Sequence, residues 1–74
     1  MRQINTSMVN WVIVCVNEFA RNNKLSPKEA FQYLFSFGGI VFLIEHYEAE
    51  HMLSLDDTIE DLGLVCRNEG GHLL

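Results

Sequence analysis

The sequence predicts an all-α protein, arranged as a small four-helix bundle or an orthogonal helical array. Apolar residues recur at helical spacing in four segments, serine caps precede two of these segments, and glycine pairs follow two of them. No linker, repeat or low-complexity segment divides the 74 residues. We therefore expect one domain over residues 1–74, with an ordered core of about residues 7–68 and flexible termini.

The first helix is expected over residues 7–22, because its apolar residues follow the helical period. The main apolar stripe and an adjoining stripe consist of Met8, Trp11, Val12, Cys15 and Phe19, and of Val9, Ile13, Val16 and Ala20. A helix this apolar is either the central element of the fold or half of an interface. The alternative is a buried β-strand over residues 11–16, because Val and Ile favour strands.

The second helix has the clearest local signal in the sequence. Ser26 stands at the N-cap position, Pro27 at the first helical position and Glu29 at the third. Ser26 and Glu29 can then each satisfy a backbone N–H of the first turn. We expect the helix to begin at Pro27 and to end at Gly38 and Gly39, which tolerate a positive φ. Its apolar face consists of Ala30, Phe31, Leu34 and Phe37.

A third helix is expected over residues 40–51 and a fourth after the Ser54 cap. The third helix carries Ile40, Leu43, Ile44 and Tyr47 on its inward face and Glu45, Glu48 and Glu50 on its solvent face. The fourth has Asp56 and Asp57 in its first turn, where they complement the positive end of the helix dipole. The glycine pair at residues 70–71 ends it.

Charge is distributed unevenly along the chain. The net charge is −5, and the stretch from Glu29 to Cys66 contains eight acidic side chains and no Lys or Arg. Affinity for a phosphate backbone comes largely from Lys and Arg, so we expect no direct nucleic-acid binding. A basic protein surface would be attracted instead. The sequence has no signal-peptide pattern and no long apolar run, which predicts a cytoplasmic protein without membrane association.

Residues that could carry chemistry are few. Cys15 and Cys66 lie in apolar runs without metal-binding spacing, so we expect buried, reduced thiols, with a disulfide between them as the alternative. His46 and His51 point about 140° apart on a helix and cannot jointly grip one metal ion. The sequence therefore predicts no catalytic residue, no metal site and no cofactor. The alternative is a metal-dependent enzyme that uses both histidines and nearby glutamates.

Acidic and aromatic side chains point to a binding surface. Asp56 and Asp57 are explained by helix capping, whereas Glu60 and Asp61 are not needed for it and are available to meet Arg or Lys of a partner. The aromatic rings are mostly core, but we expect at least one to be exposed and to anchor an interface. The residues predicted to bind a partner are Glu45, Tyr47, Glu48, His51, Asp57, Glu60 and Asp61.

Residues 25–62, LSPKEAFQYLFSFGGIVFLIEHYEAEHMLSLDDTIEDL, resemble a family of short bacterial proteins known only as a domain of unknown function. The shared motifs are an LSxxEAFxYL-like helix, a FLIExYxxxH segment and a DDTxxDL-like closing helix. Tyr47 and His51 match the family's Tyr and His positions, whereas Glu50 stands where an apolar residue is more often expected. The resemblance implies an antitoxin-like or accessory role beside toxin-type proteins related to ADP-ribosyltransferases.

These observations predict a non-enzymatic module that binds or regulates a protein partner, either basic or toxin-like. The alternative is a self-associating structural domain, in which the helix over residues 7–22 packs against a second copy to form a homodimer. Co-purification with the product of a neighbouring gene would support the first hypothesis. A monomeric mass at high concentration would contradict the second.

Overall fold

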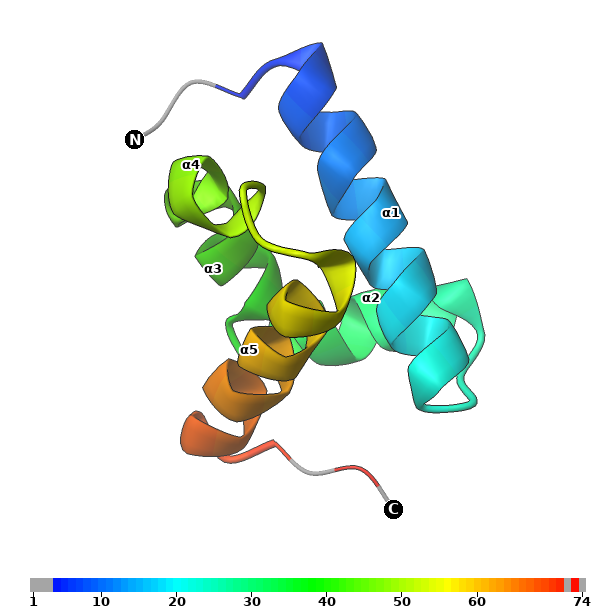
Figure 1. Ribbon diagram of the computed structural model, residues 1–74. Coiled ribbons are helices and arrows are strands. Elements are labelled where there is room, and N and C mark those ends of the chain that lie inside the picture. The colour runs from blue at the N-terminus through cyan, green and yellow to red at the C-terminus, as the bar shows by residue number, and fades with distance from the viewer. Residues whose placement is uncertain (1–3, 72, 74) are drawn as a thin grey trace.

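The computed structural model describes residues 4–71 and 73, and these contain five helices (Figure 1). The helices are α1 (Thr6–Asn22), α2 (Pro27–Ser36), α3 (Gly39–Glu45), α4 (Tyr47–Glu50) and α5 (Leu55–Asn68). No strand occurs within the described part of the chain, so the all-α class is confirmed and the alternative strand over residues 11–16 is wrong. The prediction of flexible termini partly concerns residues 1–3, 72 and 74, which lie outside the described residues.

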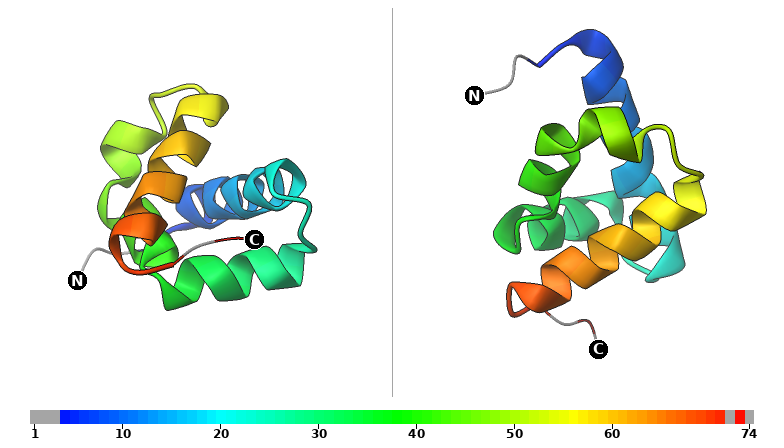
Figure 2. Two further views of the ribbon diagram at one scale, coloured as in Figure 1. Left: turned by 90° about the horizontal axis from the view of Figure 1, so that it is seen from below. Right: turned by 60° about the vertical axis from the view of Figure 1, so that its left-hand side comes forward.

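The helices cross one another rather than lying parallel, so an orthogonal array describes the fold better than a bundle does (Figure 2). α1 packs against α2, α3 and α5, and α3 packs in turn against α2, α4 and α5. α1 is therefore a central element of the fold. This is one of the two roles that its apolar sequence predicted.

Local capping bonds determine where α1 and α2 begin. The Met8 backbone N–H donates to Asn5 Oδ1 over 2.9 Å, so α1 begins at Thr6, one residue before the predicted start. In α2 the Glu29 N–H donates to Ser26 Oγ over 3.1 Å, and the Ser26 N–H donates to Glu29 Oε1 over 2.8 Å. This reciprocal pair confirms the predicted helix start, and its hydrogen bonds lower the pKa of Glu29.

The prediction of one continuous helix over residues 40–51 is wrong. His46 has φ −112° and ψ 23°, outside the helical range, so the segment forms α3 and the four-residue α4. The described residues therefore contain five helices where four were predicted. After the break, the Tyr47 ring packs edge-on against Trp11 of α1, with ring centroids 5.3 Å apart. A contact between distant parts of the chain thus accompanies the change in backbone direction.

The glycine pair after α2 has two different roles. Gly38 has φ 82°, a left-handed conformation that ends α2 as predicted. Gly39 is already the first residue of α3, at a point where the backbone approaches α2 and α5 closely. A Cβ at Gly39 would lie 2.8 Å from Leu34 Cδ2 and 3.1 Å from Cys66 Sγ. A side chain at this position would therefore collide with the packed core.

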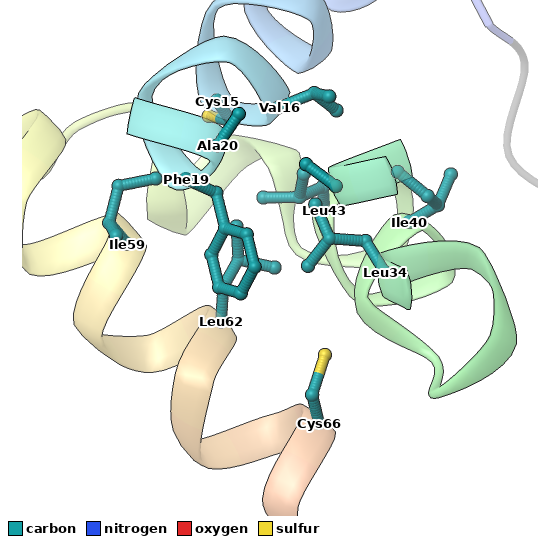
Figure 3. Packing of buried hydrophobic residues seen from close by; sticks show 11 residues of the cluster. Cys15, Val16, Phe19, Ala20, Leu34, Ile40, Leu43, Ile59, Leu62 and Cys66 are labelled. Atoms are coloured by element: carbon teal, nitrogen blue, oxygen red, sulfur yellow. The ribbon is translucent and has the colours of Figure 1, made fainter. Parts of the chain in front are cut away.

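The core lies between the C-terminal half of α1 and helices α2, α3 and α5 (Figure 3). Its buried residues include Cys15, Val16, Phe19, Ala20, Leu34, Ile40, Leu43, Ile59, Leu62 and Cys66. Removing these side chains from water is the main stabilising contribution to a chain of this size. Both cysteines are buried free thiols, as predicted.

Candidate functional site

An apolar groove of about 210 Å³ lies between α1, α2 and α3. The side chains that line it are all apolar: Ile4, Met8, Val9, Val12, Ile13, Phe31 and Ile44. Met8 is buried at the base, whereas Ile4, Val9, Ile13 and Phe31 each keep 43–51% of their surface exposed. Contiguous apolar side chains that remain this exposed are typical of a binding surface rather than of a core.

The groove exists because the second apolar stripe of α1 is covered at one end only. Val16 and Ala20, at the C-terminal end of the stripe, are buried. Val9 and Ile13, at the N-terminal end, are 43% and 51% exposed. Helical periodicity in the sequence placed these four apolar residues in one stripe of the helix. It did not indicate which of them other helices would cover, because that depends on where the neighbouring helices lie.

The aromatic side chains are less buried than predicted. None of Phe31, Tyr33, Phe35, Phe37, Phe42 and Tyr47 is fully buried. Phe31 and Phe35 are 45% and 66% exposed, and their rings stack with centroids 6.0 Å apart. They follow Ala30 and Leu34 directly in sequence, and these smaller residues occupy the buried face of α2. Phe31 was placed on the same apolar face as Ala30 and Leu34, but unlike them it is not buried. The expectation of at least one exposed ring is confirmed.

Glu50 was predicted to face solvent, but it is buried. Only 8% of it is exposed, and its Oε1 has no hydrogen-bond partner among the described residues. Burial, followed by a hydrogen bond and the negative charge of Asp61, raises the pKa of Glu50 to about 7. Glu50 lies in α4, beyond the break at His46, so the helical spacing from Leu43 does not determine the direction of its side chain. The sequence prediction of exposure depended on the charge of the side chain.

Four of the predicted binding residues lie around the break between α3 and α4. The rings of Tyr47 and His51 stack with centroids 4.3 Å apart, and His51 Nδ1 lies 2.6 Å from the Tyr47 carbonyl oxygen. Tyr47 is half-buried, whereas Glu45, Glu48 and His51 are exposed. Of these four residues, the structure brings Tyr47 and His51 into direct contact.

The three predicted binding residues of α5 do not share one surface. Asp61 lies near enough to Glu50 of α4 to raise the pKa of that carboxyl group, and Asp57 adds to the negative charge there. Glu60 instead lines a separate cavity of about 410 Å³ between α1, α2 and α5, together with Arg67. Adjacent helical residues point about 100° apart, which accounts for the separation of Glu60 from Asp61. The acidic residues therefore occupy at least two places.

Metal binding and thiol chemistry find little support in the arrangement. Among the described residues there is no group of three His, Cys, Asp or Glu side chains that could hold a metal ion, so the alternative enzyme based on His46 and His51 has no metal site there. Burial and, secondarily, the charge of Glu50 raise the pKa of Cys15 to about 12, and burial raises the pKa of Cys66. Both enclosed thiols are therefore protonated near neutral pH.

The fold and the groove define a small all-helical domain with a partly exposed apolar surface. The chain belongs to the protein family of unknown function DUF3791, whose sequence model matches residues 10–69. This match runs from α1 to the end of α5 and includes the acidic residues described above. No curated protein and no solved structure matches the chain. Within the described part, none of the helices has the length and apolar character needed to cross a membrane.

Proposed function

We propose that this chain is a non-enzymatic module that binds another protein through the apolar groove. The observation that carries the proposal is the exposure of Ile4, Val9, Ile13 and Phe31 side by side, because soluble proteins seldom leave such side chains contiguous and open to water. The enclosed, protonated thiols support the non-enzymatic part, because the thiolate is the reactive form of cysteine.

The exposed acidic residues indicate that the partner has a basic surface. Glu45, Glu48 and Asp57 are exposed and Asp61 is partly exposed, in a chain of net charge −5. A partner with a basic surface would be steered towards them. The resemblance of residues 25–62 to the bacterial family supports a finer proposal: an antitoxin-like role in the cytoplasm, directed at a toxin related to ADP-ribosyltransferases.

Co-expression with the product of a neighbouring gene tests this function. We expect the two proteins to co-purify, and we expect Ile13→Asp to weaken their binding by about tenfold or more, because a charge replaces an apolar contact. Val14→Asp is the matched control, since Val14 lies on the same helix and is 50% exposed, like Ile13, but does not line the groove. No binding at micromolar sensitivity, or an equal loss in both variants, would contradict the proposal.

Self-association through α1 is a second candidate. The half-exposed face that contains Val9 and Ile13 would meet the same face of a second copy across a two-fold axis. Light scattering over a range of concentrations tests it. A mass that rises with concentration for the wild type and Val14→Asp, but not for Ile13→Asp, would support self-association. A monomeric mass at every concentration would exclude it.

A further inference from the structure

The groove has the length of a short helical segment. Its α1 side extends from Met8 to Ile13, which is about 8 Å at the rise of an α-helix, and Ile4, which precedes the helix, lengthens it. Phe31 of α2 and Ile44 of α3 form the facing walls. A bound helix with apolar residues at positions i, i+3 or i+4, and i+7 would present them over about 10 Å. About two turns of a partner helix therefore match this surface.

The lining of the groove favours a helix over an extended peptide. An extended peptide is usually recognised by adding a strand to an exposed sheet edge, and the described residues contain no strand. The lining residues are all apolar, so their side chains offer no hydrogen bonds to an incoming backbone. A helix satisfies its own backbone groups internally and presents only side chains to such a surface.

Charge distinguishes a basic partner from a second copy. The chain carries a net charge of −5, and no Lys or Arg offsets the eight acidic side chains between Glu29 and Cys66. Near the groove, Glu45 follows Ile44 on α3 and Lys28 lies one helical turn before Phe31 on α2, so the charge that distinguishes the two occupants is the net charge of the chain. A second copy would bring the same negative charge to the contact, whereas Lys or Arg beside an apolar helix face would meet the opposite charge.

We propose that the groove binds an amphipathic helix of another protein, whose apolar face contacts Val9, Ile13 and Phe31 and whose flanking side chains are Lys or Arg. The inference rests on the proposed function and adds the chemistry of the partner to it. The apolar contacts provide most of the affinity, and the flanking charges determine orientation and the rate of association.

Designed peptides test the inference without knowledge of the natural partner. The first peptide is about four helical turns long, with Leu at i, i+3, i+4 and i+7 and Lys on the remaining face. A second peptide has the same composition in a permuted order that forms no apolar face, and a third has Glu in place of Lys. Each is titrated into isotope-labelled full-length protein, and backbone amide NMR shifts report the affinity and the location of binding.

We expect the first peptide to shift the amide signals of Val9, Ile13 and Phe31 and to bind at least about tenfold more tightly than either of the others. Ile13→Ser should weaken its binding about tenfold, and Val14→Ser should leave it unchanged. Serine is neutral, so this pair of variants separates the apolar contact from the charge. Circular dichroism of both variants checks that they are equally folded.

Each contrary result removes a defined part of the inference. Equal binding of the ordered and the permuted Lys peptides would show general attraction to an acidic protein and would overturn the groove as the site. Equally tight binding of the Glu peptide would overturn the basic character of the partner. A concentration-dependent mass that Ile13→Ser abolishes would show that a second copy occupies the groove. If the neighbouring gene product binds in a manner insensitive to Ile13→Ser, the module still binds a protein but the helix-in-groove inference fails.

Discussion

The two ends of α1 differ in how completely other helices cover them. At the C-terminal end Phe19 and Ala20 are buried, and Phe19 belongs to the same cluster as Ile59 and Leu62 of α5. At the N-terminal end Ile13 remains about half exposed beside the groove. The helix is apolar at both ends, so composition does not explain the difference. An apolar stripe thus marks a surface that needs a cover, but it does not specify whether the same chain supplies it.

The largest expected effect comes from removing a buried side chain that covers the C-terminal end of α1, which we call the closed end. Leu62→Ala should lower the free energy of unfolding by about 2–5 kcal/mol, because Leu62 is fully buried. Leu64→Ala is the matched control, since Leu64 lies on the same helix but is 47% exposed, and it should cost less than about 1 kcal/mol. Urea unfolding followed by circular dichroism measures both values. Equal losses of unfolding free energy would show that Leu62 is no more buried than Leu64.

Glycine substitutions provide the next test, with opposite signs. Gly39→Ala should cost about 1–3 kcal/mol, because its Cβ would lie 2.8 Å from Leu34 Cδ2 in the closed core. Gly63→Ala should add about 0.5–1 kcal/mol, because Gly63 lies within α5 and a Cβ there approaches only the flexible Arg67 side chain, 3.3 Å away. Thermal unfolding measures both. Stabilisation by Gly39→Ala would mean that the closed end has room to repack.

The pH dependence of stability tests the enclosure of Glu50. The acidic groups that face it are Asp57 and Asp61 of α5 and the Cys15 thiol of α1. Its pKa is raised to about 7 from an ordinary value of 4.5, so the folded state holds a proton that the unfolded chain releases. The contribution of Glu50 to stability is therefore present at low pH and is lost as the pH rises from about 5 to 8.

Glu50→Gln should remove this loss, because glutamine stays neutral. At pH 8 the variant should be more stable than the wild type by on the order of 1–2 kcal/mol, and the difference should shrink towards pH 5. Glu45→Gln removes an exposed carboxylate on α3 and serves as the control, which should leave the shape of the pH curve unchanged. Urea unfolding at several pH values measures the curves. A wild-type curve that coincides in shape with that of Glu50→Gln would contradict the burial of this carboxyl group.

The smallest expected effect lies at the open end of α1. Ile13→Ser should lower the free energy of unfolding by less than about 1 kcal/mol, because the Ile13 side chain is already about half exposed to solvent. Val16→Ser, in the same apolar stripe but 7% exposed, should cost clearly more, because it leaves a buried hydroxyl and a void. Urea unfolding of the two variants gives the comparison. If Ile13→Ser is as costly as Val16→Ser, the groove belongs to the core and is not free for a partner.

Features that depend on nearby residues were predictable from the sequence, and features that depend on distant ones were not. The Ser26 and Glu29 cap is complete within one turn, so its pattern predicted the start of α2 correctly. The break at His46 coincides with a contact between Tyr47 and Trp11, which are far apart in the sequence, and no local signal marks it. The burial of Glu50 likewise depends on α5, which is distant from it in the sequence.

The candidate site shows the same division. The sequence identified the apolar residues of α1, including Val9 and Ile13, and proposed that this helix is central or forms an interface; the structure supports the first role and leaves an open surface for the second. It placed Phe31 on one apolar face with Ala30 and Leu34, because residue type alone does not distinguish the covered from the uncovered side of α2. It also grouped Glu60 with Asp61, whereas the helical turn directs them to different sides.

The order of these elements along the chain affects when the groove residues meet water. Those residues lie between Ile4 and Ile44, whereas Leu62 and Cys66, which complete the core, come later. A chain emerges from the ribosome with its N-terminus first, so the apolar surface of α1, α2 and α3 becomes accessible before α5 leaves the ribosome. A partner that is already present during translation therefore encounters this surface before the core has closed. The module would then fold and bind its partner at the same time.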